Sequence, residues 1–397
     1  MLKKSFSYLG VVYLLQILNI VLNILLIRNL SLDALGQITL AKVYFQFMDY
    51  LHLGSRFVMD RYLPTSNEKE GKLITNIAVL VSFVLSVVAI IVVYFFFNNS
   101  WVVIIFMISG SIFAQGNIYK TYFRAKEKTK DMITIVLVMS LLPLLLQLIT
   151  IVFFSFKIFV FSFLLSYTVA FIFLVYKFRL IRLMTFSSFI IKVKSIYDAA
   201  FLLFLTYLVA FFSFSIDKIL LEKYKGSVVL GEYSIILFVF ATLLIIPGTL
   251  AELVFPKIIQ KVTSSSEIIH LKEMSFVFFS TLFSIIIANL FMDYFIIKFT
   301  NYSYLLHYLH LVSWAALPYA LTSIMYHTLN ALDQRKTIFK INFLVFLLYV
   351  GYLYYVFFSL NKDVLQELVW GRILYGILLV TLYVYSLKKY HENLILR

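Results

Sequence analysis

The chain has 397 residues, of which 62% are hydrophobic and only 13% are charged, and its mean hydropathy of +0.97 lies outside the range of soluble globular domains. It has no cysteine, which excludes disulfides and thiolate metal sites. Its formal net charge is +15, and the distribution of that charge along the chain argues against nucleic acid as a partner.

Long apolar runs separated by short polar clusters predict an all-α polytopic membrane protein, because backbone groups in lipid must be satisfied within helices. Twelve spans are expected, with approximate limits 6–27, 38–59, 73–97, 101–123, 132–155, 158–176, 197–221, 233–255, 274–297, 304–329, 338–359 and 364–386. The first run is too long for a cleavable signal peptide and contains Gln16, Asn19 and Asn23. We therefore expect it to stay in the membrane.

The basic residues of the connections predict the orientation. Most lysines and arginines between spans lie at the N-terminus, at the C-terminus and after even-numbered spans. Positively charged connections stay in the cytoplasm, so both termini are expected there, in a bacterial cytoplasmic (inner) membrane. The net charge then reflects topology and not nucleic-acid binding.

A weak internal repeat divides the chain into two six-helix halves around a central cavity. Leu35-Gly36 before the second span matches Leu230-Gly231 before the eighth, and the run 124–127 after the fourth span resembles the run 330–333 after the tenth. The expected domains are an N-terminal lobe (1–176), a basic cytoplasmic linker (177–195) and a C-terminal lobe (196–397).

A stripe of charged residues lies inside the second predicted span. Lys42, Asp49 and Arg56 recur every seven residues, which on a continuous helix places them on one face over roughly 21 Å of depth. Charges are costly in lipid, so such a stripe faces other helices or a wet cavity. Two interpretations stay open: the cations contact an anionic cargo, or the three residues form an internal ion-pair network that holds helices together.

Further polar positions extend the candidate cavity. Arg372 lies about a third of the way into the last span, and Lys218, near a span end, either snorkels to the interface or joins the cavity. Three spans carry polar faces, with Gln16, Asn19 and Asn23 on the first, Thr206, Ser213 and Asp217 on the seventh, and Thr242, Thr249 and Glu252 on the eighth. Interhelical hydrogen bonding accounts for any single face, whereas matching faces in both halves favour a shared cavity. The carboxylates Asp49, Asp217 and Glu252 are candidates for proton or sodium coupling.

Two runs resemble a known family. RNLSLDALGQITLA (Arg28–Ala41) and SIDKILLEKYKGSVVLGEYSII (Ser215–Ile236) are similar to the second-helix and seventh-to-eighth-helix segments of polysaccharide flippases in the multidrug/oligosaccharidyl-lipid/polysaccharide exporter superfamily. Wzx-type O-antigen flippases are the best match, and the positions carried over are Arg28, Asp217, Gly231 and Tyr233.

The resemblance implies a specific transport function. Its members move undecaprenyl-pyrophosphate-linked oligosaccharide to the periplasmic leaflet without a cofactor. The implied partners are the lipid-linked oligosaccharide, membrane lipids and, by association, a polysaccharide polymerase and a chain-length regulator. The basic stripe and Arg28 would meet the pyrophosphate.

Two rival functions follow from the same sequence. A membrane polysaccharide polymerase usually carries a large periplasmic catalytic loop, but the longest periplasmic connections expected here, Arg28–Gln37 and Glu222–Glu232, have only about ten residues. A multidrug/cation antiporter of the same superfamily would share the fold, yet basic residues in the cavity favour an anionic cargo. No Walker-type phosphate loop is present, so direct use of ATP by this chain is not expected.

Overall fold

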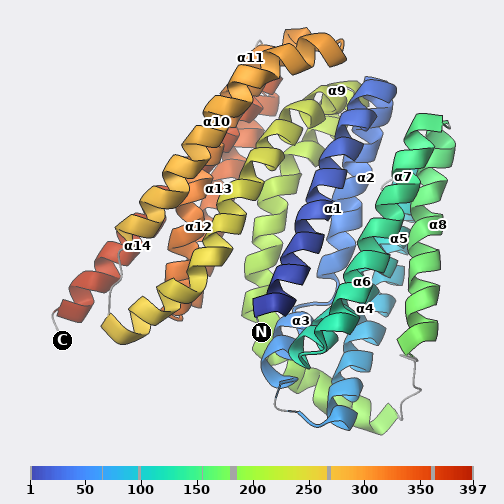
Figure 1. The fold of residues 1–397 in the computed structure, drawn as a ribbon, viewed down its shortest axis with the longest axis vertical. Coiled ribbons are helices and arrows are strands. Elements are labelled where there is room, and N and C mark those ends of the chain that lie inside the picture. Colours follow the sequence, from blue (N-terminus) through green and yellow to red (C-terminus); the bar gives the residue numbers. More distant parts are fainter. Residues whose placement is uncertain are drawn as a thin grey trace. The chain divides into compact units, whose positions relative to one another are not determined.

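The computed structural model describes residues 2–64, 66–96, 100–153, 155–178, 186–265, 270–358 and 363–395. These residues are helical apart from short turns, with no strand among them, as the hydropathy pattern predicts. The chain divides into two compact units, Met1–Phe204 and Leu205–Arg397. Figure 1 shows the helices of both units in sequence colours.

The N-terminal unit contains eight α-helices and one π-helical turn before α9. They are α1 (Leu2–Asn29), α2 (Leu32–Tyr50), α3 (Ser55–Tyr62), α4 (Glu68–Phe96), α5 (Trp101–Ala125), α6 (Thr129–Val136), the π-helical turn η1 (Leu137–Leu141), α7 (Leu142–Phe153) and α8 (Phe156–Phe178). The π-helical turn ends two residues before Pro143, which has no N–H to donate and whose ring clashes with the carbonyl four residues earlier in an α-helix. The fifth predicted span is therefore one irregular helix from Thr129 to Phe153.

Helix α5 is the centre of the N-terminal unit. It packs against α2, α3, α4, α6 and α8, and 72% of its most apolar window is buried, compared with 28% for α4. Gly110 allows the closest approach, because a Cβ at this position would lie 2.5 Å from the carbonyl oxygen of Phe45 on α2. In lipid, helices associate through such close packing and through polar contacts, since water expulsion contributes little.

The second predicted span, 38–59, is wrong in both its start and its continuity. Helix α2 begins at Leu32, where the Ser31 side chain accepts a hydrogen bond from the Ala34 N–H at 3.3 Å. It ends at Tyr50, and a turn separates it from α3. Leu53 (φ 47°) and Gly54 (φ 84°) adopt left-handed backbone conformations in that turn, which end α-helical geometry.

The C-terminal unit begins within the long helix α9 (Phe186–Ser265), in which only Gly226 departs from helical geometry (φ 84°, ψ 175°). Glycine tolerates this backbone conformation, so one residue replaces the ten-residue connection expected at 222–232. The remaining elements are α10 (Leu271–Phe299), the 3₁₀ turn η2 (Ser303–Leu305), α11 (Leu306–Ser313), α12 (Ala316–Ala331), α13 (Arg335–Phe358) and α14 (Val364–Ile395). The tenth predicted span is thus divided into η2, α11 and α12.

Helix α14 packs against α11, α12 and α13 in the C-terminal unit. A separate apolar cluster joins α9, α10 and α12 through Ala251, Val277 and Ala320, each of which is fully buried. In Figure 1, α10, α12, α13 and α14 lie together in orange to red. The unit is a helix bundle in which α12 and α14 pack directly against each other.

The matched runs 124–127 and 330–333 end their helices in the same way. Glu127 (φ 56°) and Asp333 (φ 53°) are left-handed, and the following N–H groups, of Lys128 and Gln334, donate to Phe123 and Leu329 carbonyls at 2.9 Å in both units. This is the Schellman pattern of helix C-termini. The short sequence match therefore corresponds to one capping motif in each half.

The exposed faces identify the solvent of this fold as lipid. Within the described residues, eight helices are long and apolar enough to cross a membrane, and one of them, Phe204–Ala251, has 48 residues and overlaps two predicted spans. Large apolar side chains are exposed along α4 and α10, for example Phe83, Phe279 and Leu290 at 53%, 63% and 73%. Such continuous apolar faces are unfavourable in water. The protein is a multi-pass membrane protein.

Candidate functional site

Charged side chains in the N-terminal unit meet where α2, α3 and α5 come together. A guanidinium nitrogen of Arg56 on α3 lies 2.8 Å from the Asp49 carboxylate on α2. The other Asp49 oxygen accepts a hydrogen bond from the Asn117 amide on α5 at 3.1 Å. Lys120, one turn further along α5, interacts electrostatically with both Arg56 and Asp49. We call Asp49, Arg56, Asn117 and Lys120 the N-terminal charged cluster.

The turn between α2 and α3 positions Arg56. His52, which is only 5% exposed, accepts a hydrogen bond through Nδ1 from the Gly54 N–H at 2.9 Å. Helix α3 begins directly after this hydrogen bond and the left-handed Gly54. The direction of the Arg56 side chain relative to Asp49 therefore depends on the turn and not on the periodicity of one helix. The predicted stripe is therefore divided between two helices, with Lys42 and Asp49 on α2 and Arg56 on α3.

Lys42 lies on α2, two turns before Asp49. Its ammonium group donates to the Asn23 side-chain oxygen on α1 at 3.2 Å, and Asn23 in turn donates to the Asn19 carbonyl. Among the carboxylates that the structure describes, none forms an ion pair with Lys42. The polar face expected on the first span thus meets the basic stripe of the second.

The N-terminal charged cluster and the neighbouring Lys42 together contain more positive than negative charge. Arg56 and Asp49 keep 21% and 26% of their side-chain surface exposed, and Lys42 and Lys120 are half-buried. Asp49 neutralises at most one of these three cations, and Asp60, the other carboxylate near Lys120, pairs with Arg124. The N-terminal unit therefore presents an excess of partly accessible positive charge inside helices that are otherwise apolar. Such a group of donors can bind an anion through charge-assisted hydrogen bonds.

The C-terminal unit contains a different arrangement, a buried ion pair. Arg372 on α14 lies 2.6 Å from the Asp217 carboxylate on α9, and their side chains are 1% and 0% exposed. The guanidinium also donates to the carbonyls of Ser213 and Phe214 at 2.9 and 3.1 Å. Arg372 is therefore enclosed within its own unit.

Asp217 has hydrogen-bond donors on several sides. The Tyr233 hydroxyl donates to it at 2.5 Å and the Tyr349 hydroxyl at 3.3 Å, and the Lys218 backbone N–H donates to its other oxygen. The positions that the family resemblance selects in this region, Asp217 and Tyr233, are thus in direct contact. The Asp217 carboxylate thus accepts hydrogen bonds from both charged and neutral donors.

The remaining predicted site residues do not contribute a side-chain contact to either group. Arg28 is exposed in the last turn of α1, where a cation interacts favourably with the helix dipole. The Lys218 ammonium donates to the Phe214 carbonyl at 2.7 Å on its own helix. Glu252 belongs to α9, but its side chain lies outside the residues that the structure describes.

Three residues of these groups, Asn117, Lys120 and Tyr349, were not among the predicted site residues. Asn117 completes the Asp49 environment, and Tyr349 on α13 completes that of Asp217. Asn117 had a signal in the sequence, since Gln115, Asn117 and Lys120 interrupt the apolar fourth span. Tyr349 had none, because tyrosines are numerous along the chain.

Comparison with known proteins identifies solved structures that have a similar fold. No family model and no curated protein matches the sequence. An inward-facing multidrug resistance MATE family transporter of the MOP superfamily aligns with a TM-score of 0.63 and 11% identity over 95% of this chain and 96% of its own. The lipid II flippase MurJ, in an inward closed conformation, aligns with 0.68 and 13% over 96% and 87%, and a Vibrio cholerae MATE transporter with 0.58 and 16% over 98% and 96%. The chain shares the fold of these transporters and flippases.

Proposed function

We propose that this protein is a flippase that moves an undecaprenyl-pyrophosphate-linked oligosaccharide, an O-antigen unit or a similar repeat, from the cytoplasmic to the periplasmic leaflet by alternating access. One observation carries the proposal: the N-terminal unit holds Lys42, Arg56 and Lys120 near Asp49, while Asp60, the other carboxylate near Lys120, pairs with Arg124. An excess of cations inside the bilayer is costly unless an anion visits it.

The chemistry of the cargo fits this charge pattern. A pyrophosphate offers several acceptor oxygens, and the planar guanidinium of Arg56 can bind two of them at once. Arg56 forms an ion pair with Asp49 at 2.8 Å, and the cargo phosphate would replace Asp49 as the partner of Arg56. The similarity in fold to a lipid II flippase supports a lipid-linked cargo. A polysaccharide polymerase and a chain-length regulator are the partners that such a flippase would meet.

Ion coupling is a further part of the proposal. Asp49 is the best candidate, because it is partly exposed and its bond to Arg56 is the one that cargo would replace. Asp217 is a poorer candidate, since the buried Arg372 would be left uncompensated if Asp217 were protonated. We therefore propose that a proton or sodium ion acts at Asp49.

A reconstituted flipping assay tests this function. The purified protein in proteoliposomes is expected to move a fluorescent undecaprenyl-pyrophosphate oligosaccharide across the bilayer, and an imposed pH or sodium gradient is expected to change the rate. The second candidate, a multidrug/cation antiporter, is favoured by the similarity in fold to MATE transporters. Uptake of a cationic dye coupled to either gradient, without movement of the lipid-linked oligosaccharide, would reject the flippase.

The orientation has its own expected result. Both termini and residues 177–195 should be cytoplasmic, because basic residues concentrate in those segments. Reporter fusions after Lys194 and after Lys362 should therefore give opposite signals, with cytoplasmic activity only at Lys194. Identical signals would contradict the predicted topology of the C-terminal half.

A further inference from the structure

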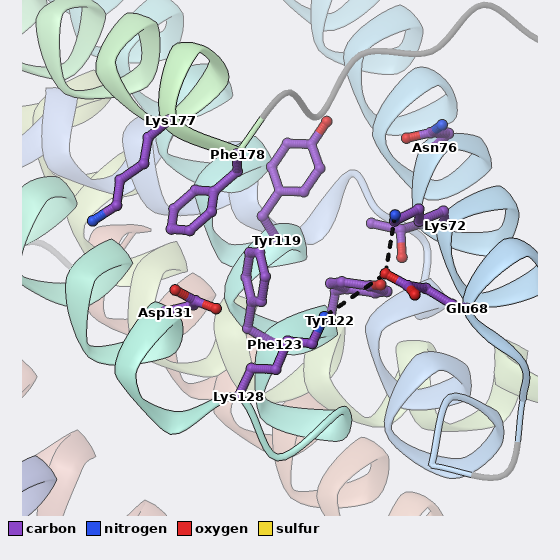
Figure 2. A pocket seen from close by; sticks show the side chains of 11 residues that line it. Glu68, Lys72, Asn76, Tyr119, Tyr122, Phe123, Lys128, Asp131, Lys177 and Phe178 are labelled. Atoms are coloured by element: carbon purple, nitrogen blue, oxygen red, sulfur yellow. Dashed lines mark ion pairs between the residues drawn. The ribbon is translucent and has the colours of Figure 1, made fainter.

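A basic pocket lies at one end of the N-terminal unit, between α4, α5, α6 and α8. It has a volume of about 410 Å³, and its lining includes Lys72, Lys128 and Lys177 together with Glu68 and Asp131. Figure 2 shows the three lysines around it, each on a different element. Its lining residues are distinct from those of the N-terminal charged cluster.

The pocket lies at the boundary between the apolar core and water. Four candidate spans, Glu68–Phe95, Trp101–Ala125, Thr129–Phe153 and Phe156–Phe178, all contribute residues within about two turns of one of their ends. Because spans begin and end where hydrocarbon gives way to headgroups, the pocket lies at headgroup level.

The pocket is lined by more lysines than carboxylates. The Glu68 carboxylate lies 3.0 Å from the Lys72 ammonium and 3.8 Å from the Lys128 ammonium, so it forms ion pairs with both lysines. Lys177 lies over the rings of Phe173 and Phe178, at 5.8 and 5.5 Å from their centres. None of the carboxylates that the structure describes forms an ion pair with Lys177. The three lysines exceed the two carboxylates by one charge.

Two neutral features also favour an anion. Tyr122 lines the pocket and is 4% exposed, yet its hydroxyl has no hydrogen-bond partner in the described part of the chain. Its ring lies beside Glu68 in Figure 2. Helix α6 begins at the pocket without a side-chain cap at Lys128, and the N–H groups of a helix start favour negative charge. An unused buried donor normally has a ligand or water.

We propose that this pocket binds the phosphate-bearing headgroup of an anionic membrane lipid. Lys72, Lys128 and the Tyr122 hydroxyl hold the phosphate in exchange for Glu68, and Lys177 contributes charge from α8. The acyl chains lie along the last turns of α8, where Ile172 and Tyr176 are 62% and 86% exposed. Basic pockets between membrane helices commonly bind such headgroups. This inference does not depend on the proposed cargo.

Native mass spectrometry of the full-length protein with phosphatidylglycerol tests it. We expect Lys72→Gln and Lys128→Gln each to lower the affinity about tenfold, since each removes one charge-assisted contact. Tyr122→Phe should lower it several-fold. Glu68→Gln should raise it several-fold, because the carboxylate that competes for both lysines is lost. A purely structural network would give no gain of binding in any variant.

Lys130→Gln is the matched control, because Lys130 is exposed on α6 but does not line the pocket. It should bind like the unmodified protein, and an equal loss in Lys130→Gln and Lys128→Gln would show diffuse attraction and overturn the proposal. Equal affinity for phosphatidylcholine would also overturn it. Full displacement of phosphatidylglycerol by an equal concentration of inorganic phosphate would assign the pocket to a soluble anion instead.

Discussion

The Arg56→Gln variant is expected to lose at least about a hundredfold in the flipping rate while it still inserts into the membrane. Two charge-assisted hydrogen bonds to the cargo phosphate disappear, each of about 1.5–3 kcal/mol, whereas removal of a charge makes a span easier to insert. Lys42→Ala should also lower the flipping rate without preventing insertion. Arg56→Lys keeps the charge but loses the bidentate geometry, so partial activity is expected. The measurements are flipping in proteoliposomes and restoration of surface polysaccharide in a flippase-null cell.

The competing structural interpretation predicts a different pattern for the same residues. If Arg56 only compensates Asp49 at 2.8 Å, the single variant should be scarce in the membrane, and adding Asp49→Asn should restore both abundance and transport. Rescue by Asp49→Asn would therefore contradict the cargo-binding role. Arg335→Gln is the matched control, because Arg335 pairs with the exposed Asp333 at 2.9 Å outside the cluster. Its transport should be unchanged.

The largest loss of stability is expected from Arg372→Met. This change leaves the fully buried Asp217 without its cation, and breaking a buried ion pair from one side costs about 3–5 kcal/mol. The tyrosine hydroxyls at 2.5 and 3.3 Å would compensate only part of that loss, since they carry no net charge. Thermal unfolding of the purified protein in detergent is the measurement.

The double variant Arg372→Met/Asp217→Asn separates the ion pair from simple packing. It removes both charges, so most of the stability should return, although the Ser213 and Phe214 carbonyls lose their donor. Equal stability of the single and double variants would show that the pair is not the cause. Arg335→Met, in an exposed pair, should cost less than about 1 kcal/mol.

The predicted elements agree with the fold in most places because hydropathy reports helices directly. Most of the predicted spans coincide with helices of the described residues, and two of the clearest departures occur where one or two residues change the backbone. Gly226 replaces an expected loop, and Leu53 and Gly54 divide an expected helix. Leucine has no preference for left-handed backbone geometry, so Leu53 did not indicate in the sequence that the helix ends there. Ser31 did carry an N-cap signal, since a serine before an acidic first turn is typical of a helix start.

The sequence by itself determined the class of protein, the polar positions within its spans and the excess of cations near Lys42 and Arg56. Those properties are local, because they depend on composition and on helical periodicity. Only the tertiary structure decided which polar residues meet. The partners Asp49 and Asn117 are 68 residues apart, and Asp217 and Arg372 are 155 apart. Side chains that face lipid and side chains that face another helix are chemically alike, so hydropathy does not reveal which spans pack together.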